Sequence, residues 1–275
     1  MIKSLLVGYD GSLGSRVALQ HAVDLAGRCE GRVLLLTAGR GTQPEGAAFE
    51  DGGVDVVGLA TRRLDSDESA KPQETDELLG DAFDLCRELT VRCHARPAYG
   101  DFAFALSRAS RLVDLVFIGR DVAGEPGRYD AAARTARRVA SGAVCPVMIA
   151  AREYEPIRSV LAVCPMADGG GRALRTAAEL ASLLQVKLEA LIVSEDVELA
   201  GRWTHEVKRY LVDHGHPSSV LVRKPPLGPH LDGLLTDRQS PLVVVPKGSP
   251  LSALRRRDPL ADALRTLHAT IVSQP

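Results

Sequence analysis

The sequence lacks the patterns of a membrane protein, a disulfide scaffold and a nucleic-acid-binding protein. No apolar run approaches the roughly 20 residues that a bilayer-spanning helix requires. The five cysteines are odd in number and form no Cys-x-x-Cys pair, so we expect reduced thiols. A formal net charge of -1 gives no reason to expect nucleic acid or a membrane surface as a partner. Met1 leads straight into a strand-like pattern without a signal sequence, and we therefore expect a cytoplasmic protein.

The short motifs of several enzyme classes are also absent. There is no Gly-x-Ser-x-Gly elbow, no Gly-x4-Gly-Lys-Ser/Thr loop, and no Gly-x-Gly-x-x-Gly behind a first strand. Tyr9-Asp10 offers one acid where a phosphate-receiver domain needs an acidic metal-binding pair. The sequence His214-Gly215-His216 has no cluster of further ligands at metal-binding spacing and is interpreted as a solvated turn. We therefore predict no catalytic residue and no metal site, and at most slow ATP hydrolysis.

One phrase of the sequence occurs twice. Ala18-Leu19-x-x-Ala22-x-x-Leu25-Ala26 returns 155 residues later as Ala173-Leu174-x-x-Ala177-x-x-Leu180-Ala181. A short apolar run precedes each copy at the same distance, and a second apolar run follows each copy. A β-α-β unit repeated at this long spacing indicates a duplicated domain and not a short-period solenoid.

Strand-like and helix-like patterns alternate through both copies. The first copy has predicted strands at 5–9, 32–37, 91–95, 115–118 and 146–150, and predicted helices at 15–26, 74–89, 102–111 and 131–140. The second copy has predicted strands near 159–163, 187–193, 219–223, 242–245 and 270–273, and predicted helices near 170–184, 196–213, 228–237 and 258–267. This alternation predicts an α/β fold with doubly wound parallel sheets and helices on both faces. Such sheets bind ligands beyond the carboxyl ends of the strands, where the strand order reverses.

A short link near 152–156 separates the copies. We therefore expect a first domain over 1–152 and a second over 153–275, packed together. The first domain carries a long insertion at about 39–75 that is rich in Gly, Asp, Glu, Ser and Thr. Two interpretations of the insertion stay open, a mobile surface loop and a lid over the site, because it leaves from the edge where a site is expected.

Five motifs fall in the order and spacing of one known family. They are Val7-Gly8-Tyr9-Asp10-Gly11-Ser12, the repeated Ala-Leu phrase, Tyr99-Gly100-Asp101, Leu115-Val116-Phe117-Ile118-Gly119 and Cys145-Pro146-Val147-Met148-Ile149. On these residues the chain resembles the universal stress protein family, well over 1–150 and more weakly over 156–273. It looks like a tandem member, in which two fused domains form the pair that single-domain relatives make by dimerising.

The resemblance implies two five-stranded parallel sheets of order 3-2-1-4-5 and a regulatory binding module of the stress response. In nucleotide-binding members, an Asp after the first strand and backbone at the end of the second hold adenosine. A loop of pattern Gly-x2-Gly-x9-Gly-Ser/Thr holds the phosphates, because glycine lets backbone N–H groups approach them. By the resemblance, Asp10, Gly11, Ala38 and Gly119 would hold ATP (as Mg-ATP) or another adenine nucleotide. Arg120, Gly124, Gly127 and Arg134 are further candidates, for a modified phosphate site.

The sequence departs from that loop pattern. Val122 stands where the second glycine belongs, and its β-branched side chain disfavours positive φ. Ala133-Arg134 stand where the family has Gly-Ser/Thr. In one interpretation Gly124 and Gly127 re-form the cradle in a shifted register, with arginines supplying charge. In the other, the loop merely connects a strand to a helix, and the chain is a nucleotide-free regulatory or scaffold protein.

The second copy has lost more of the site. Pro165 replaces the acidic residue, and Pro246 stands where the family uses glycine. Its expected role is therefore structural, to cover an edge of the first domain. The edge strands 147–150 and 271–273 should pair with each other, because unpaired edges invite aggregation. Whether two such chains associate further as a homodimer stays open.

Overall fold

The computed structural model describes residues 2–38, 73–120, 129–165, 170–217, 219–224, 231, 233–235, 238–247 and 269–275. Its strands are β1 (Ser4–Tyr9), β2 (Arg32–Ala38), β3 (Arg92–Ala98), β4 (Leu115–Ile118), β5 (Val147–Ile149), β6 (Ser159–Pro165), β7 (Lys187–Val193), β8 (Ser219–Arg223), β9 (Pro241–Pro246) and β10 (Thr270–Gln274). Its longer helices are α1 (Leu13–Cys29), α3 (Gln73–Glu88), α4 (Phe102–Ala109), α5 (Tyr129–Gly142), α6 (Gly170–Leu184) and α7 (Val197–Asp213).

These elements confirm the predicted α/β alternation. The predicted bounds of α6, β7 and β8 agree with the structure residue for residue. The predicted helix 258–267, most of the predicted helix 228–237 and the insertion from 39 to 72 lie outside the described residues. Within the residues described above, every helix falls short of the length and apolar character that spanning a membrane requires.

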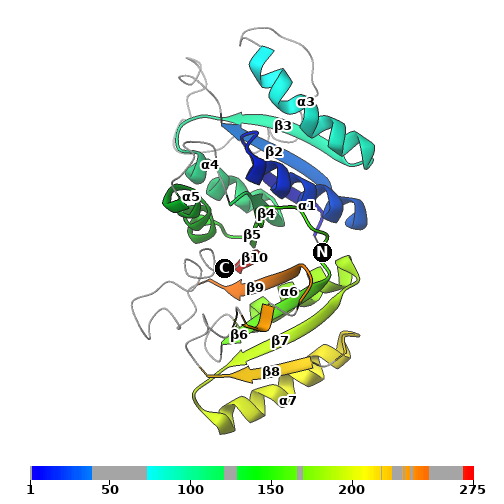
Figure 1. Ribbon diagram of the computed structural model, residues 1–275, viewed down its shortest axis with the longest axis vertical. Coiled ribbons are helices and arrows are strands. Elements are labelled where there is room, and N and C mark those ends of the chain that lie inside the picture. The colour runs from blue at the N-terminus through cyan, green and yellow to red at the C-terminus, as the bar shows by residue number, and fades with distance from the viewer. Residues whose placement is uncertain are drawn as a thin grey trace.

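The described strands form one continuous sheet of order β3-β2-β1-β4-β5-β10-β9-β6-β7-β8. All neighbours are parallel except β5 and β10, which pair antiparallel, with Ile149 opposite Ile271. The sequence predicts two five-stranded sheets, and the structure corrects this to one ten-stranded sheet. The physical reason is the predicted pairing of the two edge strands, which satisfies backbone groups that separate sheets would leave open. β3 and β8 lie at the two ends of the sheet, and β5 meets β10 in the middle (Figure 1).

Each face of the sheet is covered by its own set of helices. On one face, the apolar residues of β1 at positions 5, 7 and 9 pack in a cluster with α1, α3, α6 and α7. On the other face, Leu6 packs in a cluster with α4, α5 and the helical residues 231 and 235. This division follows from the alternation of side chains along a strand, and burial on both faces explains the nearly continuous apolar runs.

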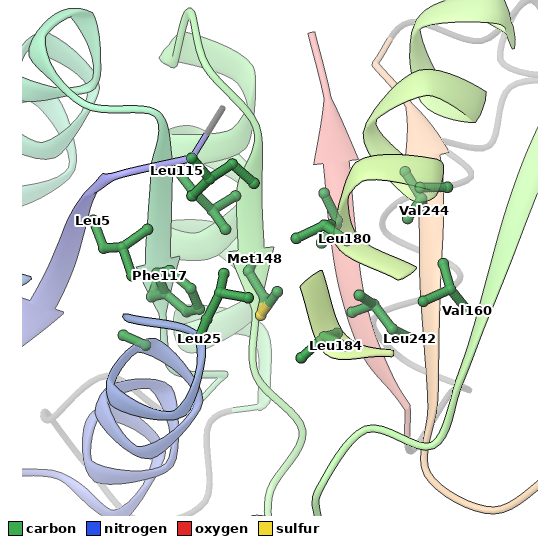
Figure 2. Packing of buried hydrophobic residues seen from close by; sticks show 14 of the residues in the cluster. Leu5, Leu25, Leu115, Phe117, Met148, Val160, Leu180, Leu184, Leu242 and Val244 are labelled. Atoms are coloured by element: carbon green, nitrogen blue, oxygen red, sulfur yellow. The ribbon is translucent and has the colours of Figure 1, made fainter. Parts of the chain in front are cut away.

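The first cluster crosses the junction between β5 and β10. Met148 of β5 lies between Leu25 of α1 and Leu184 of α6, and all three are at most 5% exposed (Figure 2). Burying each such side chain contributes about 1.5–3 kcal/mol. The two halves of the chain therefore share one apolar layer in addition to one sheet.

Candidate functional site

The strand order reverses beside β1. β1 lies between β2 and β4, from which the sheet extends in opposite directions. The helix that follows β1, α1, packs on one face, whereas α5, which follows β4, packs on the other. The carboxyl ends of β1 and β4 therefore form a topological switch point, which is where open α/β sheets hold ligands.

Asp10 is the first residue beyond β1 at this switch point. The backbone N–H of Ser12 donates to its Oδ1 at 3.0 Å. Gly11 between them has φ of 76°, a left-handed conformation that glycine adopts without strain. Asp10 is only half-buried. The sequence thus places a carboxylate acceptor, held by its own turn, at the rim where a hydroxyl or amino group of a ligand can reach it.

Two serines join Asp10 to the start of α1. Ser12 is the N-cap of α1, and its side chain accepts from the backbone N–H of Ser15 at 3.2 Å. Ser15 is buried in the first turn, where its hydroxyl donates to the Ser12 carbonyl at 2.9 Å and accepts from the Asp10 N–H at 3.4 Å. Neither serine is among the predicted site residues, although the Asp-x-Ser-x-x-Ser spacing is a signal for this turn. The positive end of α1 therefore lies beside the carboxylate.

Gly119 lies directly against this first turn. A Cβ atom at position 119 would stand 2.2 Å from the carbonyl carbon of Gly14, closer than any real contact. The backbone that leaves β4 and the backbone that begins α1 therefore touch, and only glycine permits the approach. Gly119 thus belongs to the same edge as Asp10 and Gly11, and packing on α1 alone already requires a glycine there.

Arg120 contacts the second half of the chain. It is 8% exposed, and its Nη2 donates at 2.6 Å to the carbonyl of Ala269, the residue before β10. Lys247, the residue after β9, makes a similar contact from the second half to the first. Its Nζ donates to the Ala143 carbonyl at 3.4 Å. Both cations therefore contact backbone of the opposite half. Sequence reasoning assigned Arg120 to phosphate and missed this role.

The remaining predicted residues are placed only in part. Ala38 ends β2, one position beyond the pairing of Thr37 with Tyr9, and is therefore next to Asp10 along the sheet edge. Arg134 lies within α5. Gly124 and Gly127 lie outside the described residues, as does Val122. The structure thus brings Asp10, Gly11, Ala38 and Gly119 to one edge and directs Arg120 to the junction.

Tyr9 is the last residue of β1, directly before Asp10. Burial raises its pKa, and the Arg16 guanidinium, which is hydrogen-bonded to it, pulls the pKa the other way. Arg16 also lies 3.5 Å from the Asp81 carboxylate of α3. Because its pKa is above an already high ordinary value, the Tyr9 hydroxyl stays protonated near neutral pH and serves as a hydrogen-bonding group.

No group of three or more His, Cys, Asp and Glu side chains is placed to hold a metal ion within the described part of the chain. His214 and His216 make separate contacts. Nδ1 of His214 lies 2.8 Å from the Tyr210 carbonyl, and Nε2 of His216 lies 3.1 Å from the Ser182 hydroxyl. One imidazole thus contacts the last turn of α7, and the other contacts α6.

A family model described as "Universal stress protein family" matches residues 1–151. No curated protein matches the chain significantly. A universal stress protein from Archaeoglobus fulgidus DSM 4304 is similar in structure with a TM-score of 0.70 and 13% identity, over 98% of this chain and 97% of the other. A putative universal stress protein from Pseudomonas aeruginosa UCBPP-PA14 gives a TM-score of 0.65 and 15% identity, over 99% and 93%.

The cytoplasmic domain of a prokaryotic cation chloride cotransporter is also similar, with a TM-score of 0.53 and 10% identity over 99% of this chain and 94% of the other. At these identities the likeness concerns the fold alone. A function must therefore be argued from the residues of the site.

Proposed function

The chain belongs to the universal stress protein family, and from this premise we propose that it is a regulatory stress-response module whose first half binds an adenine nucleotide. The site lies at the switch point between β1 and β4. The observation that carries the proposal is the placement of Asp10, whose Oδ1 accepts from the Ser12 N–H at 3.0 Å beside the start of α1. A half-buried carboxylate held in this way is suited to accept hydrogen bonds from ribose hydroxyls or the adenine amino group.

The adenosine side of the site fits such a ligand better than the phosphate side. Asp10 and the end of β2 at Ala38 supply fixed polar groups along one edge. Gly119 brings the backbone after β4 directly against the first turn of α1, next to Asp10. When bound, ATP would bring a Mg²⁺ ion with its phosphates, and the N-terminal half of α5, which includes Arg134, is the element that follows the loop.

Calorimetric titration of the full chain with Mg-ATP tests the proposal. We expect measurable heat for the wild type and a loss of at least tenfold in affinity for Asp10→Asn, which keeps the size of the side chain but removes its charge. Asp84→Asn is the matched control, because Asp84 is an exposed aspartate on α3 that pairs with Arg87. The absence of heat with wild type at millimolar ATP would refute nucleotide binding. Equal affinity of the two variants would remove Asp10 from the site.

The second candidate is a nucleotide-free scaffold, and the position of Arg120 favours it. The Arg120 guanidinium, a candidate phosphate ligand in a modified site, is buried and donates to the Ala269 carbonyl. In this interpretation Arg120 helps to hold the two halves together. Mass spectrometry of protein purified without added ligand separates the candidates, because a co-purifying adenine nucleotide supports the first and its absence together with a silent titration supports the second.

We also propose that residues 1–152 and 153–275 are two domains of one kind, fused as a pseudo-dimer. The pairing of Ser4 with Arg32 in β1 and β2 recurs 155 positions later as the pairing of Ser159 with Lys187 in β6 and β7. The order β8-β7-β6-β9-β10 repeats β3-β2-β1-β4-β5. A cysteine pair at Met148 and Val272, which face each other across the junction, should cross-link within one chain. Cross-linking between two chains would show instead that the halves pair with those of a second molecule.

A further inference from the structure

Two cysteine side chains meet between α3 and β3. The face of α3 that packs on the sheet carries Leu79, Ala82 and Cys86, at the three- and four-residue spacing of one helical stripe. All three are buried, and Cys86 is 1% exposed. The sulfur of Cys86 therefore points from the last turn of the helix toward the sheet.

Cys93 lies on the strand opposite this stripe. It pairs with Val33 of β2, whose side chain belongs to the cluster on the α1 and α3 face. Cys93 packs against the same cluster but is partly exposed, because β3 is the outermost strand. The two cysteines thus approach the same layer from the helix and from the strand.

The connection between α3 and β3 fixes this approach. The Val91 N–H donates to the Cys86 carbonyl at 2.8 Å, and Thr90, with φ of 55°, donates its N–H to the Arg87 carbonyl at 3.0 Å. This tight helix end turns the chain back at once onto β3. The thiols of Cys86 and Cys93 are hydrogen-bonded to each other, and this contact lowers the pKa of Cys86 and raises that of Cys93.

The other cysteines have no such arrangement. The thiols of Cys29, Cys145 and Cys164 donate to backbone carbonyls at 3.6–3.8 Å. Burial raises the pKa of all three, to about 12 for Cys145 and Cys164. Thiols with raised pKa values hold little thiolate at neutral pH and react slowly. These three cysteines therefore serve as internal controls.

We propose that Cys86 and Cys93 form a redox pair that a peroxide oxidises to an intrachain disulfide. One thiolate attacks the peroxide O–O bond, giving a sulfenic acid and, with one proton, water. The second thiol then attacks that sulfur, forming the S–S bond and releasing the sulfenic hydroxyl with a proton as a second water. Hydrogen peroxide is thus reduced to two waters while the two thiols are oxidised by two electrons. The disulfide ties the last turn of α3 to β3 at the end of the sheet.

Thiol counting on the full chain under hydrogen peroxide tests the proposal. The wild type should fall from five free thiols to three, lose about 2 Da in intact mass, and recover both with dithiothreitol. A peptide map under non-reducing conditions should join the peptides that contain Cys86 and Cys93. The map uses only the wild-type protein and does not depend on whether a variant folds.

Two variants complete the test. Cys93→Ser should form no disulfide under the treatment that oxidises the wild type, because its partner is gone, and should lose at most one thiol, through a sulfenic acid at Cys86. Cys145→Ala, which removes a control thiol, should still lose two. The proposal is overturned if the wild type keeps five thiols, if the disulfide joins any other cysteines or two chains, or if a sulfinic acid forms at either residue while the other stays reduced.

Discussion

The two halves of the chain share a strand order and register, and they differ in chemistry at corresponding positions. In the first half, β1 is followed by Asp10 and a serine-capped helix start. In the second half the corresponding residue, 155 positions later, is Pro165, which is buried and still pairs with Val193 as the last residue of β6. A proline cannot accept a hydrogen bond through its side chain. The strand pairing is therefore kept although the acidic side chain is absent from the second half, which indicates that the fold does not require Asp10.

A second comparison concerns the residues that follow the central strands. Arg120 follows β4 and Gly119, whereas Lys247 follows β9 and Pro246, and each cation donates to backbone of the opposite half. The residue before each cation differs, since Gly119 touches α1 and Pro246 is paired opposite Gln274 in β10. The junction contact is thus common to both halves, whereas the residue before the cation touches a helix start in the first half and pairs within the sheet in the second.

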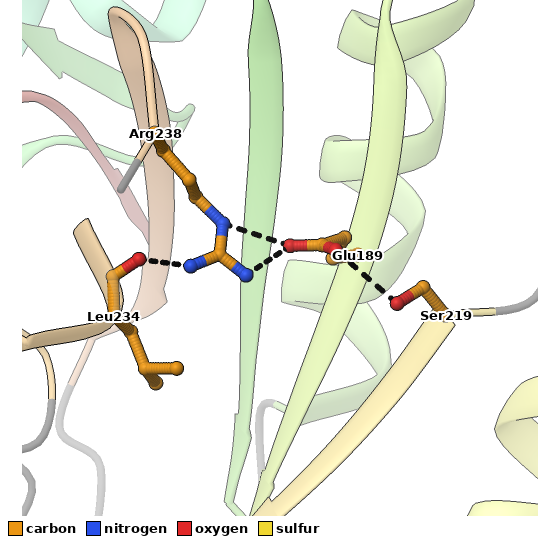
Figure 3. Close-up of polar contacts among 4 residues, drawn as sticks. All are labelled: Glu189, Ser219, Leu234 and Arg238. Atoms are coloured by element: carbon orange, nitrogen blue, oxygen red, sulfur yellow. Dashed lines mark hydrogen bonds and ion pairs between the residues drawn. The ribbon is translucent and has the colours of Figure 1, made fainter. Parts of the chain in front are cut away.

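A third difference lies inside β7. Glu189 occupies the place that Leu34 has in β2, and its Oε2 accepts from Nε of Arg238 at 2.8 Å and pairs with Nη2 (Figure 3). The Ser219 hydroxyl donates to Glu189 at 3.2 Å, and Nη1 of Arg238 donates to the Leu234 carbonyl. The second half therefore holds Leu234 and Arg238 against its sheet through a partly buried ion pair, where the first half has an apolar side chain.

The largest expected effect comes from filling the space at Gly119. Gly119→Ala should lower the free energy of unfolding by about 3 kcal/mol or more, because the new methyl group meets backbone that cannot yield as a side chain does. Gly201→Ala on α7, where nothing lies within 4 Å of the new atom, should instead raise it by roughly 0.5–1 kcal/mol. Urea unfolding of both variants checks the pair. Equal stability of the two would show that α1 does not pack on residue 119.

The next effect depends on pH. Burial lowers the pKa of His21 to about 4, against a smaller opposing effect of Asp24. His21 lies in the junction, with Nε2 3.4 Å from the Thr270 hydroxyl and its ring 4.9 Å from that of Tyr154. The neutral form is favoured in the folded state, so this contribution is present above the unfolded pKa near 6.5 and is lost as pH falls toward 4. The loss should reach on the order of 3 kcal/mol at lower pH.

Replacing His21 by the residue at the corresponding position of the second half tests whether His21 causes this pH dependence. Thr176 stands in the second half where His21 stands in the first, and it contacts Gln274 at 2.5 Å. His21→Thr should therefore flatten the dependence of unfolding free energy on pH between 6.5 and 4. His205→Thr, at an exposed position on α7, should leave the dependence unchanged. A His21→Thr protein with the wild-type pH profile would place the titrating group elsewhere.

These contacts also show how much of the structure could be predicted from the sequence. The bounds of α6 and β7 could be predicted because the Ala-Leu phrase repeats at a fixed spacing of 155 residues. The clear strand patterns of the first copy then indicate where the matching elements of the second copy lie. The N-cap could not be predicted, because Ser12 and Ser15 both suit the role and only the backbone after Asp10 decides between them. The direction of Arg120 depends on Ala269, 149 residues away, and no local pattern carries such information. The sequence therefore predicts which residues follow the strands at this edge, but not the contacts that their side chains make.

The ion pair of the second half should give a smaller effect. Glu189→Leu, which copies Leu34, should cost about 2 kcal/mol, because it leaves Arg238 partly buried without its carboxylate. Glu189→Leu combined with Arg238→Met should recover most of that loss, because the segment then packs as apolar residues do in the first half. A double-mutant cycle measured by urea unfolding gives the coupling energy. Additive losses would mean that the two side chains do not interact.

The smallest effects separate the two junction cations. Arg120→Met should cost about 1–2 kcal/mol, because the buried guanidinium loses a charge-assisted hydrogen bond of 2.6 Å to Ala269. Lys247→Met should cost about 0.5 kcal/mol or less, because Lys247 is exposed and its contact with Ala143 is 3.4 Å long. Thermal unfolding of each variant at matched salt measures the difference. If the lysine variant lost more stability than the arginine variant, the second half, and not the first, would hold the stronger side of the junction.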